Sequence, residues 1–176
     1  MAQLAETLVQ EWLHLQGFFT IRGLKAGLTE ADILAVRLRA GKPPEARHVE
    51  VQVSFRPISH VAPYTKDLAK KYGKSRNAAG VRLPADQAVC VEAWVEKKFK
   101  NPKMDALRKK LCPGAEWKNQ LVYGAMKFDY ELELLKRHVE AISFESVLED
   151  AKKSVGKGYA TAAGGDLAEI IRSLEK

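Results

Sequence analysis

The chain has little cysteine and no long hydrophobic run. Its 176 residues include two cysteines, Cys90 and Cys112, whose wide spacing matches no metal-binding motif. We therefore expect reduced thiols and no disulfide framework. No apolar stretch approaches the roughly 20 residues of a membrane span, and the opening MAQLAETLVQEW lacks the basic region of a secretory signal. These absences predict a cytoplasmic protein with no membrane partner.

The composition is that of a globular protein with a basic surface. Hydrophobic residues make up 46% of the chain and aromatic residues 8%, which is enough for one core and argues against disorder. The formal net charge is +7, from 29 Lys and Arg against 22 Asp and Glu. Such an excess favours an anionic partner, and nucleic acid is the first candidate.

The N-terminal third predicts a helix followed by three strands. Apolar residues at helical spacing indicate an amphipathic helix over 3–16. Strands are expected over 18–22, 30–38 and 47–55, and their close succession predicts an antiparallel meander. We expect 39–46 to form a turn, because its two prolines and a glycine interrupt a regular hydrogen-bond ladder.

The rest of the chain predicts helices that alternate with strands. The expected helices are 65–79 in its first part, 84–100, 101–111, 129–138 and 145–154, and the expected strands are 118–126 and 139–144. A strand, a helix and a strand joined by short links form a parallel unit with helices packed on the sheet. We therefore expect a three-layer α/β/α sandwich with a mixed sheet over 1–155. A flexible connector and a C-terminal helix should occupy 156–176.

Two acidic residues lie inside predicted strands. Residues 48–55 read HVEVQVSF, so every second side chain is apolar and the opposite face carries His48, Glu50 and Gln52. Asp32 interrupts the apolar run of the preceding strand. If the two strands pair, Asp32 and Glu50 reach the same edge of the sheet. Buried ionised carboxylates need a metal or a cation, and an all-oxygen site suits Mg²⁺ or Mn²⁺.

The order of these elements and motifs resembles the restriction-endonuclease-like superfamily, the PD-(D/E)xK nucleases. In that family a helix with an acid precedes a meander that carries Asp on its second strand and a (D/E)xK triplet on its third. The corresponding segments are LAETLVQEW, EADILAV and Glu50-Val51-Gln52, and LVYGAMKFDYELELLKRHVEAISFESVLEDA is similar to the closing strands and helices. Gln52 stands where the family lysine is expected, as in the E-x-Q, Mrr-like branch, and Ala31 replaces the family proline.

The resemblance implies a metal-dependent DNA endonuclease and a role for each matching residue. Asp32 and Glu50 would bind Mg²⁺ or Mn²⁺, and Gln52 would assist by orienting a water molecule or a phosphate oxygen. The acid of the first helix would be Glu6 or Glu11; the spacing to the helix end favours Glu6, but both lie outside the apolar stripe. Cleavage of both DNA strands would favour a homodimer.

Two basic segments are candidates for contact with phosphate groups. The first contains Lys66, Lys70, Lys71, Lys74 and Arg76, and the second covers 97–110. Phosphate contacts position nucleic acid without reading its sequence. The alternative is that both segments are ordinary solvated helix faces.

Other interpretations of the same residues stay open at this point. Asp32 could be a buried polar residue held by a backbone or arginine partner, and Glu50 and Gln52 could lie on the solvated face of an edge strand. The same fold could serve a catalytically inactive nucleic-acid-binding protein, which the absence of the family lysine favours. It could also serve an assembly protein that uses the helices of 145–176 as its partner surface.

Overall fold

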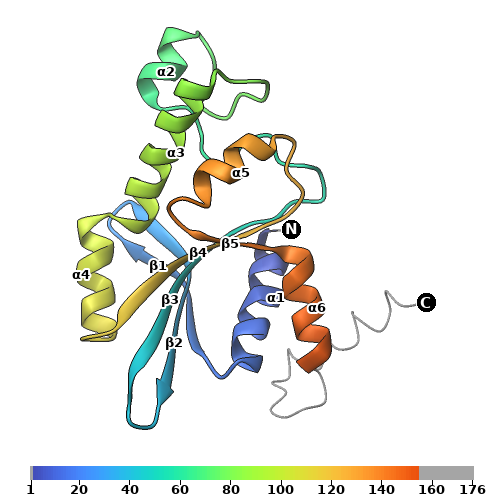
Figure 1. Ribbon diagram of the computed structural model, residues 1–176. Coiled ribbons are helices and arrows are strands. Elements are labelled where there is room, and N and C mark those ends of the chain that lie inside the picture. Colours follow the sequence, from blue (N-terminus) through green and yellow to red (C-terminus); the bar gives the residue numbers. More distant parts are fainter. Residues whose placement is uncertain (1, 155–176) are drawn as a thin grey trace.

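The computed structural model of the protein describes residues 2–154. They form one five-stranded sheet in the order β1-β2-β3-β4-β5, with helices on both sides (Figure 1). The strands are β1 (Phe19–Ala26), β2 (Thr29–Arg39), β3 (Lys42–Gln52), β4 (Glu116–Tyr123) and β5 (Glu140–Ser143). The helices are α1 (Ala2–Leu15), α2 (Lys66–Lys71), α3 (Pro84–Phe99), α4 (Pro102–Leu111), α5 (Asp129–Leu135) and α6 (Phe144–Ser154).

The sheet is mixed, as the sequence predicted. β1, β2 and β3 form an antiparallel meander. β4 pairs with β3 in parallel, and β5 pairs with β4 in parallel. The chain crosses from β3 to β4 through α2, α3 and α4, and from β4 to β5 through α5. This topology confirms the α/β class and makes β3 the central strand.

Side chains that alternate along the strands pack into two separate hydrophobic cores, one on each face of the sheet. Ile33 and Val49 point to the face that α1 and α6 cover, where they pack with Val9 and Val147. Strand side chains that point the other way, such as Leu121 of β4, lie on the face that α3 and α5 cover. A smaller cluster under α4 joins Met104 of that helix to Leu34 of β2. Helices cover both faces in the middle of β3, where the polar residues His48 and Glu50 are 0% exposed.

The predicted turn over 39–46 is wrong in its second half. β3 already begins at Lys42 and includes Pro43 and Pro44. The pairing with β4 starts only at Glu45, so both prolines lie where β3 has a neighbour on one side alone. Proline lacks an N–H donor and is tolerated at such places. The β2–β3 pairing shifts register between Arg37 and Arg39, which accommodates them.

The end of β3 also differs from the prediction. The strand stops at Gln52 instead of continuing to residue 55, because the chain leaves the sheet there. Phe55, the last apolar residue of the alternating stretch 48–55, is 81% exposed. The alternative that Glu50 belongs to the solvated face of an edge strand is excluded, because β3 has a neighbour on each side and Glu50 is 0% exposed.

Three further predictions have different outcomes. The helix expected in the first part of 65–79 is confirmed as α2, which ends there because Gly73 adopts a positive φ of 58° just after it. β1 extends to Ala26, beyond its predicted end. The C-terminal helix and connector predicted over 156–176 lie outside the described residues. Among residues 2–154, no helix has the length and apolar character that a membrane span requires.

Candidate active site

The two predicted acids lie next to each other on β2 and β3. Ile33 pairs with Val49 in antiparallel register, and Asp32 and Glu50 are the next residues beyond that pair. Both side chains point to the face that α3 covers, opposite to Ile33 and Val49. Glu50 is fully buried and the Asp32 side chain is 18% exposed. One oxygen of Asp32, Oδ2, accepts a hydrogen bond of 2.8 Å from the backbone N–H of Val51.

A lysine from α3 completes this pair of acids. Lys98 lies in the last turn of α3, and its Nζ forms an ion pair with Oε2 of Glu50. The same Nζ is 3.9 Å from Oδ1 of Asp32 and donates a 3.0 Å hydrogen bond to the backbone carbonyl of Glu30. A helix distant in the sequence therefore places a positive charge beside the two acids.

Lys98 was predicted only as part of the basic segment 97–110, and its contact with Glu50 was not predicted. The signal was present in its helical position. Lys98 follows Val91 by seven residues and Trp94 by four, and both of these side chains are buried. A lysine that continues the buried stripe of an amphipathic helix points toward the core, where it needs an acidic partner.

His48 and Arg108 support Glu50 from its other side. Nε2 of His48 lies 3.1 Å from Oε1 of Glu50, and Nδ1 of His48 lies 3.4 Å from Nη1 of Arg108. Arginine can only donate, so Nδ1 must accept and Nε2 must carry the proton. His48 therefore donates its N–H to Glu50. Arg108 is itself held by Asn119 Oδ1 at 3.1 Å and by the Phe99 carbonyl at 2.7 Å.

The pKa values of these groups reflect burial and crowding of like charges. Burial, followed by repulsion from Glu50, raises the pKa of Asp32 to about 6. Burial raises the pKa of Glu50 to about 7, although Lys98 opposes the shift. Burial, together with the charges of Arg108 and Lys98, lowers the pKa of His48 to about 3 and keeps its ring neutral. Both acids therefore give up their protons less readily than exposed carboxylic acids, chiefly because they are buried.

The donor set is compatible with a magnesium ion but small. Within residues 2–154, no three His, Cys, Asp or Glu side chains gather in a way that could hold a metal ion. Magnesium usually keeps several waters and binds through one or two carboxylates together with substrate phosphates. Asp32 and Glu50 fit that requirement. An ion shared by both would compete with Lys98 for Oε2 of Glu50.

The other predicted site residues lie around this pair. Gln52 is half-buried, projects from β3 on the same side as Glu50, and pairs with Tyr123 of β4. Glu6 of α1 forms a 3.0 Å ion pair with Arg22 of β1. After burial and repulsion from Glu50, the negative charge of Glu6 is the smallest of the causes that raise the pKa of Asp32.

Glu11, the alternative acid of α1, is engaged elsewhere. It is buried, and its Oε1 lies 3.2 Å from Nδ1 of His14. The structure therefore favours Glu6 as the acid of α1 that influences Asp32. It does not bring either residue into contact with Asp32 or Glu50 in any hydrogen bond or ion pair found among the described residues.

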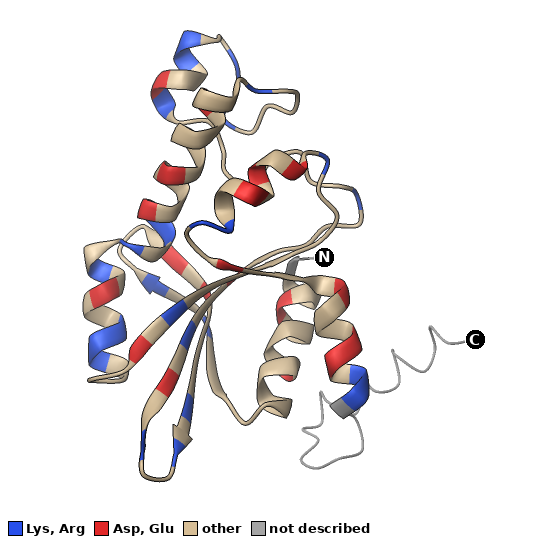
Figure 2. Ribbon diagram, in the orientation of Figure 1, with Lys and Arg blue, Asp and Glu red and all other residues tan. Residues whose placement is uncertain are grey.

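The predicted phosphate-contacting residues lie away from the acids. Lys66, Lys70, Lys71, Lys74 and Arg76 are all exposed, on α2 and the loop after it. α2 lies beside the beginning of α3, whereas Lys98 is near the end of that helix (Figures 1 and 2). Lys71 is 3.8 Å from Asp86, and Arg76 donates to the backbone carbonyl of Tyr64 at 2.8 Å.

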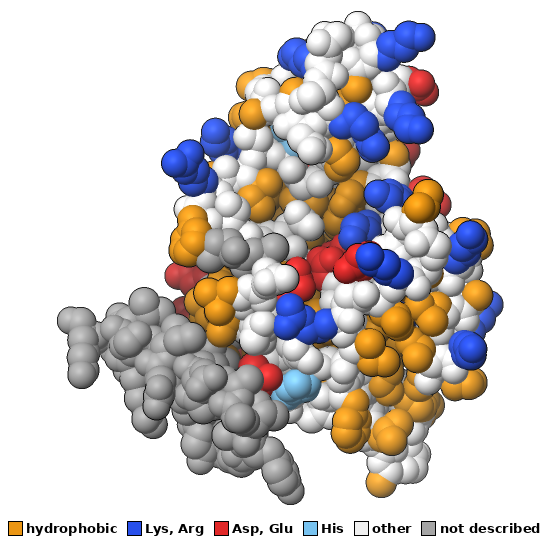
Figure 3. All heavy atoms as spheres, turned by 180° about the vertical axis from the view of Figure 1, so that it is seen from behind, with side chains coloured by type: hydrophobic (Ala, Val, Ile, Leu, Met, Phe, Trp, Pro, Cys, Tyr) orange, Lys and Arg blue, Asp and Glu red, His pale blue; other side chains and the backbone are white. Residues whose placement is uncertain are grey.

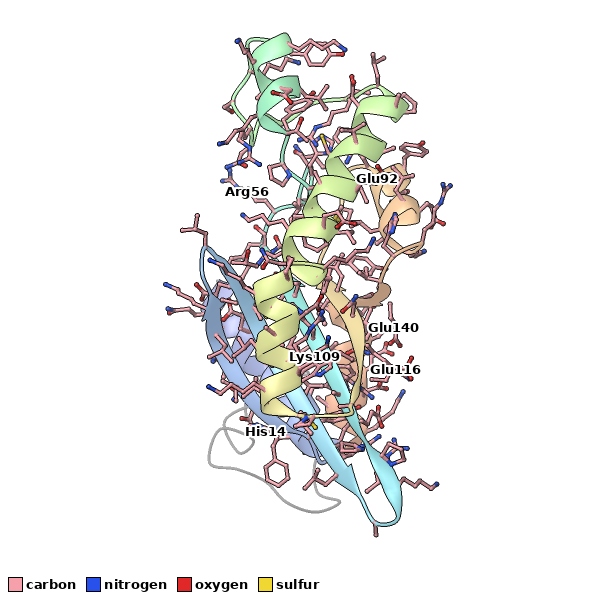
Figure 4. All side chains as sticks on the ribbon, turned by 90° about the vertical axis from the view of Figure 1, so that its left-hand side faces the viewer. His14, Arg56, Glu92, Lys109, Glu116 and Glu140 are labelled. Carbon is pink, nitrogen blue, oxygen red and sulfur yellow. The ribbon has the colours of Figure 1, made fainter. Side chains whose placement is uncertain are left out.

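The second basic segment, 97–110, divides into two groups. Lys98 and Arg108 belong to the network around Glu50, whereas Lys97, Lys100, Lys103, Lys109 and Lys110 are exposed. Figure 4 looks onto α3 and α4, which follow one another along this side of the sheet and carry these lysines. On the view from behind, acidic and basic side chains adjoin near the middle of the surface (Figure 3). Of the exposed lysines, Lys97 and Lys100 are the nearest to Lys98 along the chain.

Comparison with known proteins adds no family assignment. A scan against models of protein families found no match, and neither the curated proteins nor the solved structures gave one. The geometry of the site is therefore the basis for its function.

Proposed function

We propose that this chain is a metal-dependent DNA endonuclease with a three-layer, restriction-endonuclease-like α/β/α fold of the PD-(D/E)xK type. The observation that carries the proposal is the meeting of Asp32, Glu50 and Lys98. Two adjacent strands contribute the acids at neighbouring positions, and α3 contributes the ammonium group that contacts Glu50 and lies near Asp32. Two carboxylates and one lysine are the set of groups that the PD-(D/E)xK motif brings together.

The chemistry assigns a role to each group. Asp32 and Glu50 would hold Mg²⁺ or Mn²⁺, which when bound polarises a phosphoryl oxygen and lowers the pKa of a water molecule. The Lys98 ammonium would stabilise the negative charge that builds up on the phosphate oxygens during attack by water. The Gln52 amide would orient that water or a phosphate oxygen. His48 donates to Glu50 and keeps its carboxylate in place.

A cleavage assay tests the proposal. Supercoiled, linear, single-stranded and branched DNA would be incubated with Mg²⁺ or Mn²⁺ and the wild type, Asp32→Ala or Glu50→Gln. We expect metal-dependent cutting by the wild type and its loss in both variants, with far-ultraviolet circular dichroism unchanged. Absence of cutting on every substrate, together with no Mn²⁺ binding in calorimetry, would exclude the nuclease. Cutting that survives both substitutions would point to a different site.

A second function, nucleic-acid binding without catalysis, is favoured by one specific observation. Lys98 already pairs with Glu50, and the described residues offer no third His, Cys, Asp or Glu ligand. In that case the ion pair is a fixed structural element. The same experiments separate the two functions: an inactive binder retains salt-dependent affinity for DNA but shows neither cutting nor Mn²⁺ binding. An assembly role through 145–176 predicts little affinity for DNA.

A further inference from the structure

Arg82, in the loop before α3, is a buried cation without an acidic partner. The residue is 8% exposed, and no salt bridge joins it to an Asp or Glu among residues 2–154. Removing a guanidinium from water without a counter-charge is unfavourable, so buried arginines are normally paired. Here the compensation is partial, since the guanidinium carbon lies 4.0 Å above the centre of the Tyr64 ring.

The guanidinium is fixed on one side and unpartnered on the other. Nη1 of Arg82 donates a 2.7 Å hydrogen bond to the backbone carbonyl of Ala62. Nε and Nη2 are buried and have no hydrogen-bond partner within the described part of the chain. These two nitrogens form one edge of the planar group, from which two parallel N–H bonds project. That edge is the fork that binds a phosphate or carboxylate through two hydrogen bonds at once.

Gln87 places a second unpartnered polar group in the same cavity. It is 3% exposed, and neither its amide oxygen nor its amide nitrogen has a partner among the described residues. Arg82 and Gln87 both line a cavity of about 100 Å³, and Arg82 also lines an adjoining cavity of about 240 Å³ that contains Ser59 and Asn77. Native proteins rarely leave so many buried polar atoms unpaired in one place, so these groups have the capacity to bind a polar ligand.

Glu131 is the one carboxylate among the described residues that line these two cavities, and it already accepts hydrogen bonds. Glu131 lines the smaller cavity, but its Oε1 accepts a 2.8 Å hydrogen bond from Ala62 N–H. Its Oε2 lies 3.2 Å from Val61 N and 3.3 Å from His60 Nδ1. Because the carboxylate of Glu131 accepts hydrogen bonds from the loop backbone, it does not pair with Arg82. Nε and Nη2 of Arg82 can therefore donate to an anion.

We propose that Arg82 and Gln87 form a binding site for a phosphate group. Nε and Nη2 of Arg82 donate hydrogen bonds to two phosphate oxygens. The amide nitrogen of Gln87 donates to a third oxygen, or its amide oxygen accepts a hydrogen bond from a neighbouring group of the ligand. The exposed side chains of Val81 (82%) and Tyr130 (49%) form the rim, and the ligand enters when they move aside.

The position of this site relative to Lys98 identifies a source for the phosphate, on the premise that the proposed nuclease function is correct. Gln87 and Lys98 lie on the same helix, eleven residues apart. That spacing is about three turns and about 16 Å, so both face the same side of α3. At about 3.4 Å per nucleotide along a strand, a phosphate held by Arg82 lies about five nucleotides from the one beside Lys98. The alternative source is a free phosphorylated small molecule.

Binding to the metal-free full-length chain tests the site without any cleavage step. Calorimetry would use inorganic phosphate and a single-stranded ten-nucleotide DNA as separate titrants. Arg82→Lys keeps the charge but loses the fork, and Gln87→Glu brings a carboxylate into the cavity. Arg56→Lys, at an exposed arginine outside both cavities, is the matched control.

We expect phosphate binding by the wild type and by Arg56→Lys, and an affinity at least about tenfold weaker in Arg82→Lys, which corresponds to about 1.4 kcal/mol. Gln87→Glu should abolish binding and raise the melting temperature, because its carboxylate pairs with Arg82. If Arg82→Lys also loses about tenfold in affinity for DNA, the phosphate comes from the nucleic-acid backbone. If it loses affinity for inorganic phosphate alone, the phosphate belongs to a small molecule.

Two results would overturn the site: no phosphate or DNA binding by the wild type, or equal binding by wild type and Gln87→Glu. If Arg82→Lys does not fold, Gln87→Glu alone decides. Arg82 and Gln87 are separate from Asp32, Glu50 and Lys98. Failure of the nuclease proposal is therefore seen in cleavage and in Mn²⁺ binding, and failure of this site in phosphate binding.

Discussion

The ammonium group of Lys98 and the carboxylate of Glu50 form an ion pair in the middle of the molecule, although the two residues are 48 positions apart in the chain. Glu50 is fully buried on the central strand, and Lys98 reaches it from the end of α3. Burial of an unpaired carboxylate is strongly unfavourable. The pair therefore links the position of α3 to the sheet and puts a positive charge beside both acids.

Lys98 should be required for DNA cleavage, whereas the neighbouring Lys97 should not. In Lys98→Met we expect DNA cleavage to fall at least about 100-fold, because the charge that stabilises the transition state is lost. Lys97→Met, at an exposed position on the same helix, should cleave like the wild type. Rates would be measured under single-turnover conditions with Mg²⁺. An equal loss of cleavage in both variants would mean that cleavage depends on the total charge of α3 and not on the contact of Lys98 with Glu50.

Asp32 should make the metal-free protein relatively less stable as the pH rises. Its pKa is about 6 in the folded protein against 3.8 in the unfolded chain, so the folded state binds more protons between those values. Stability from this group is therefore lost as the pH rises from about 4 to about 6. Asp32→Asn stays neutral, so its stability relative to the wild type should increase across that window. Urea unfolding at pH 4, 5, 6 and 8 measures the difference.

The same experiment with Mn²⁺ provides the control. A bound cation offsets the repulsion between Asp32 and Glu50, so it should raise the stability of the wild type at pH 8 and change Asp32→Asn much less. A stability difference that stays constant with pH would contradict the assignment of the raised pKa to Asp32.

His48 should remain neutral with its proton on Nε2 at pH 5. Burial and the nearby charges of Arg108 and Lys98 lower its pKa to about 3, and Arg108 occupies the lone pair of Nδ1. Nitrogen-15 chemical shifts of the imidazole ring report both properties. A titration near 6.5 would show that the ring is accessible to water and does not hold Glu50.

Loss of the Arg108 contact should impair catalysis by displacing Glu50. In Arg108→Met, His48 can adopt the other tautomer, and its N–H no longer points to Glu50. We expect kcat to fall about tenfold or more, with little change in KM, and the nitrogen-15 shifts to show a mixture of tautomers. A melting temperature measured in parallel separates this effect from unfolding. If kcat drops while the tautomer stays the same, Arg108 acts only through packing.

Glu131 should be essential for the stability of the loop that precedes α2. Its carboxylate accepts hydrogen bonds from the backbone of Val61 and Ala62, and the residue is 1% exposed. Glu131→Gln should lower the free energy of unfolding by about 2 kcal/mol, because the hydrogen bonds from Val61 and Ala62 would then meet a neutral amide in place of a carboxylate. Glu133→Gln, on the same helix with a side chain 62% exposed, should change it by less than about 0.5 kcal/mol. Similar values for the two variants in urea unfolding would disprove the role.

Much of the sheet and the acid pair could be predicted from local patterns. The alternation from His48 to Gln52 identified a strand with polar residues on one face, and the strand before it was found with Asp32 in place. A short connection between them made antiparallel pairing the natural arrangement, and this pairing brings Asp32 beside Glu50. The errors lie where local rules compete with context, as at the two prolines that β3 accepts at its start.

The sequence by itself determined the alternation of strands and helices, the mixed sheet and the juxtaposition of Asp32 and Glu50, because these follow from short-range periodicity and from neighbours joined by a turn. Only the tertiary structure decided which cation serves them. Lys98 is one of many lysines in a basic stretch, and its contact with Glu50 depends on how α3 packs over β3. Such packing is set by contacts between segments distant in the chain, which no local pattern encodes.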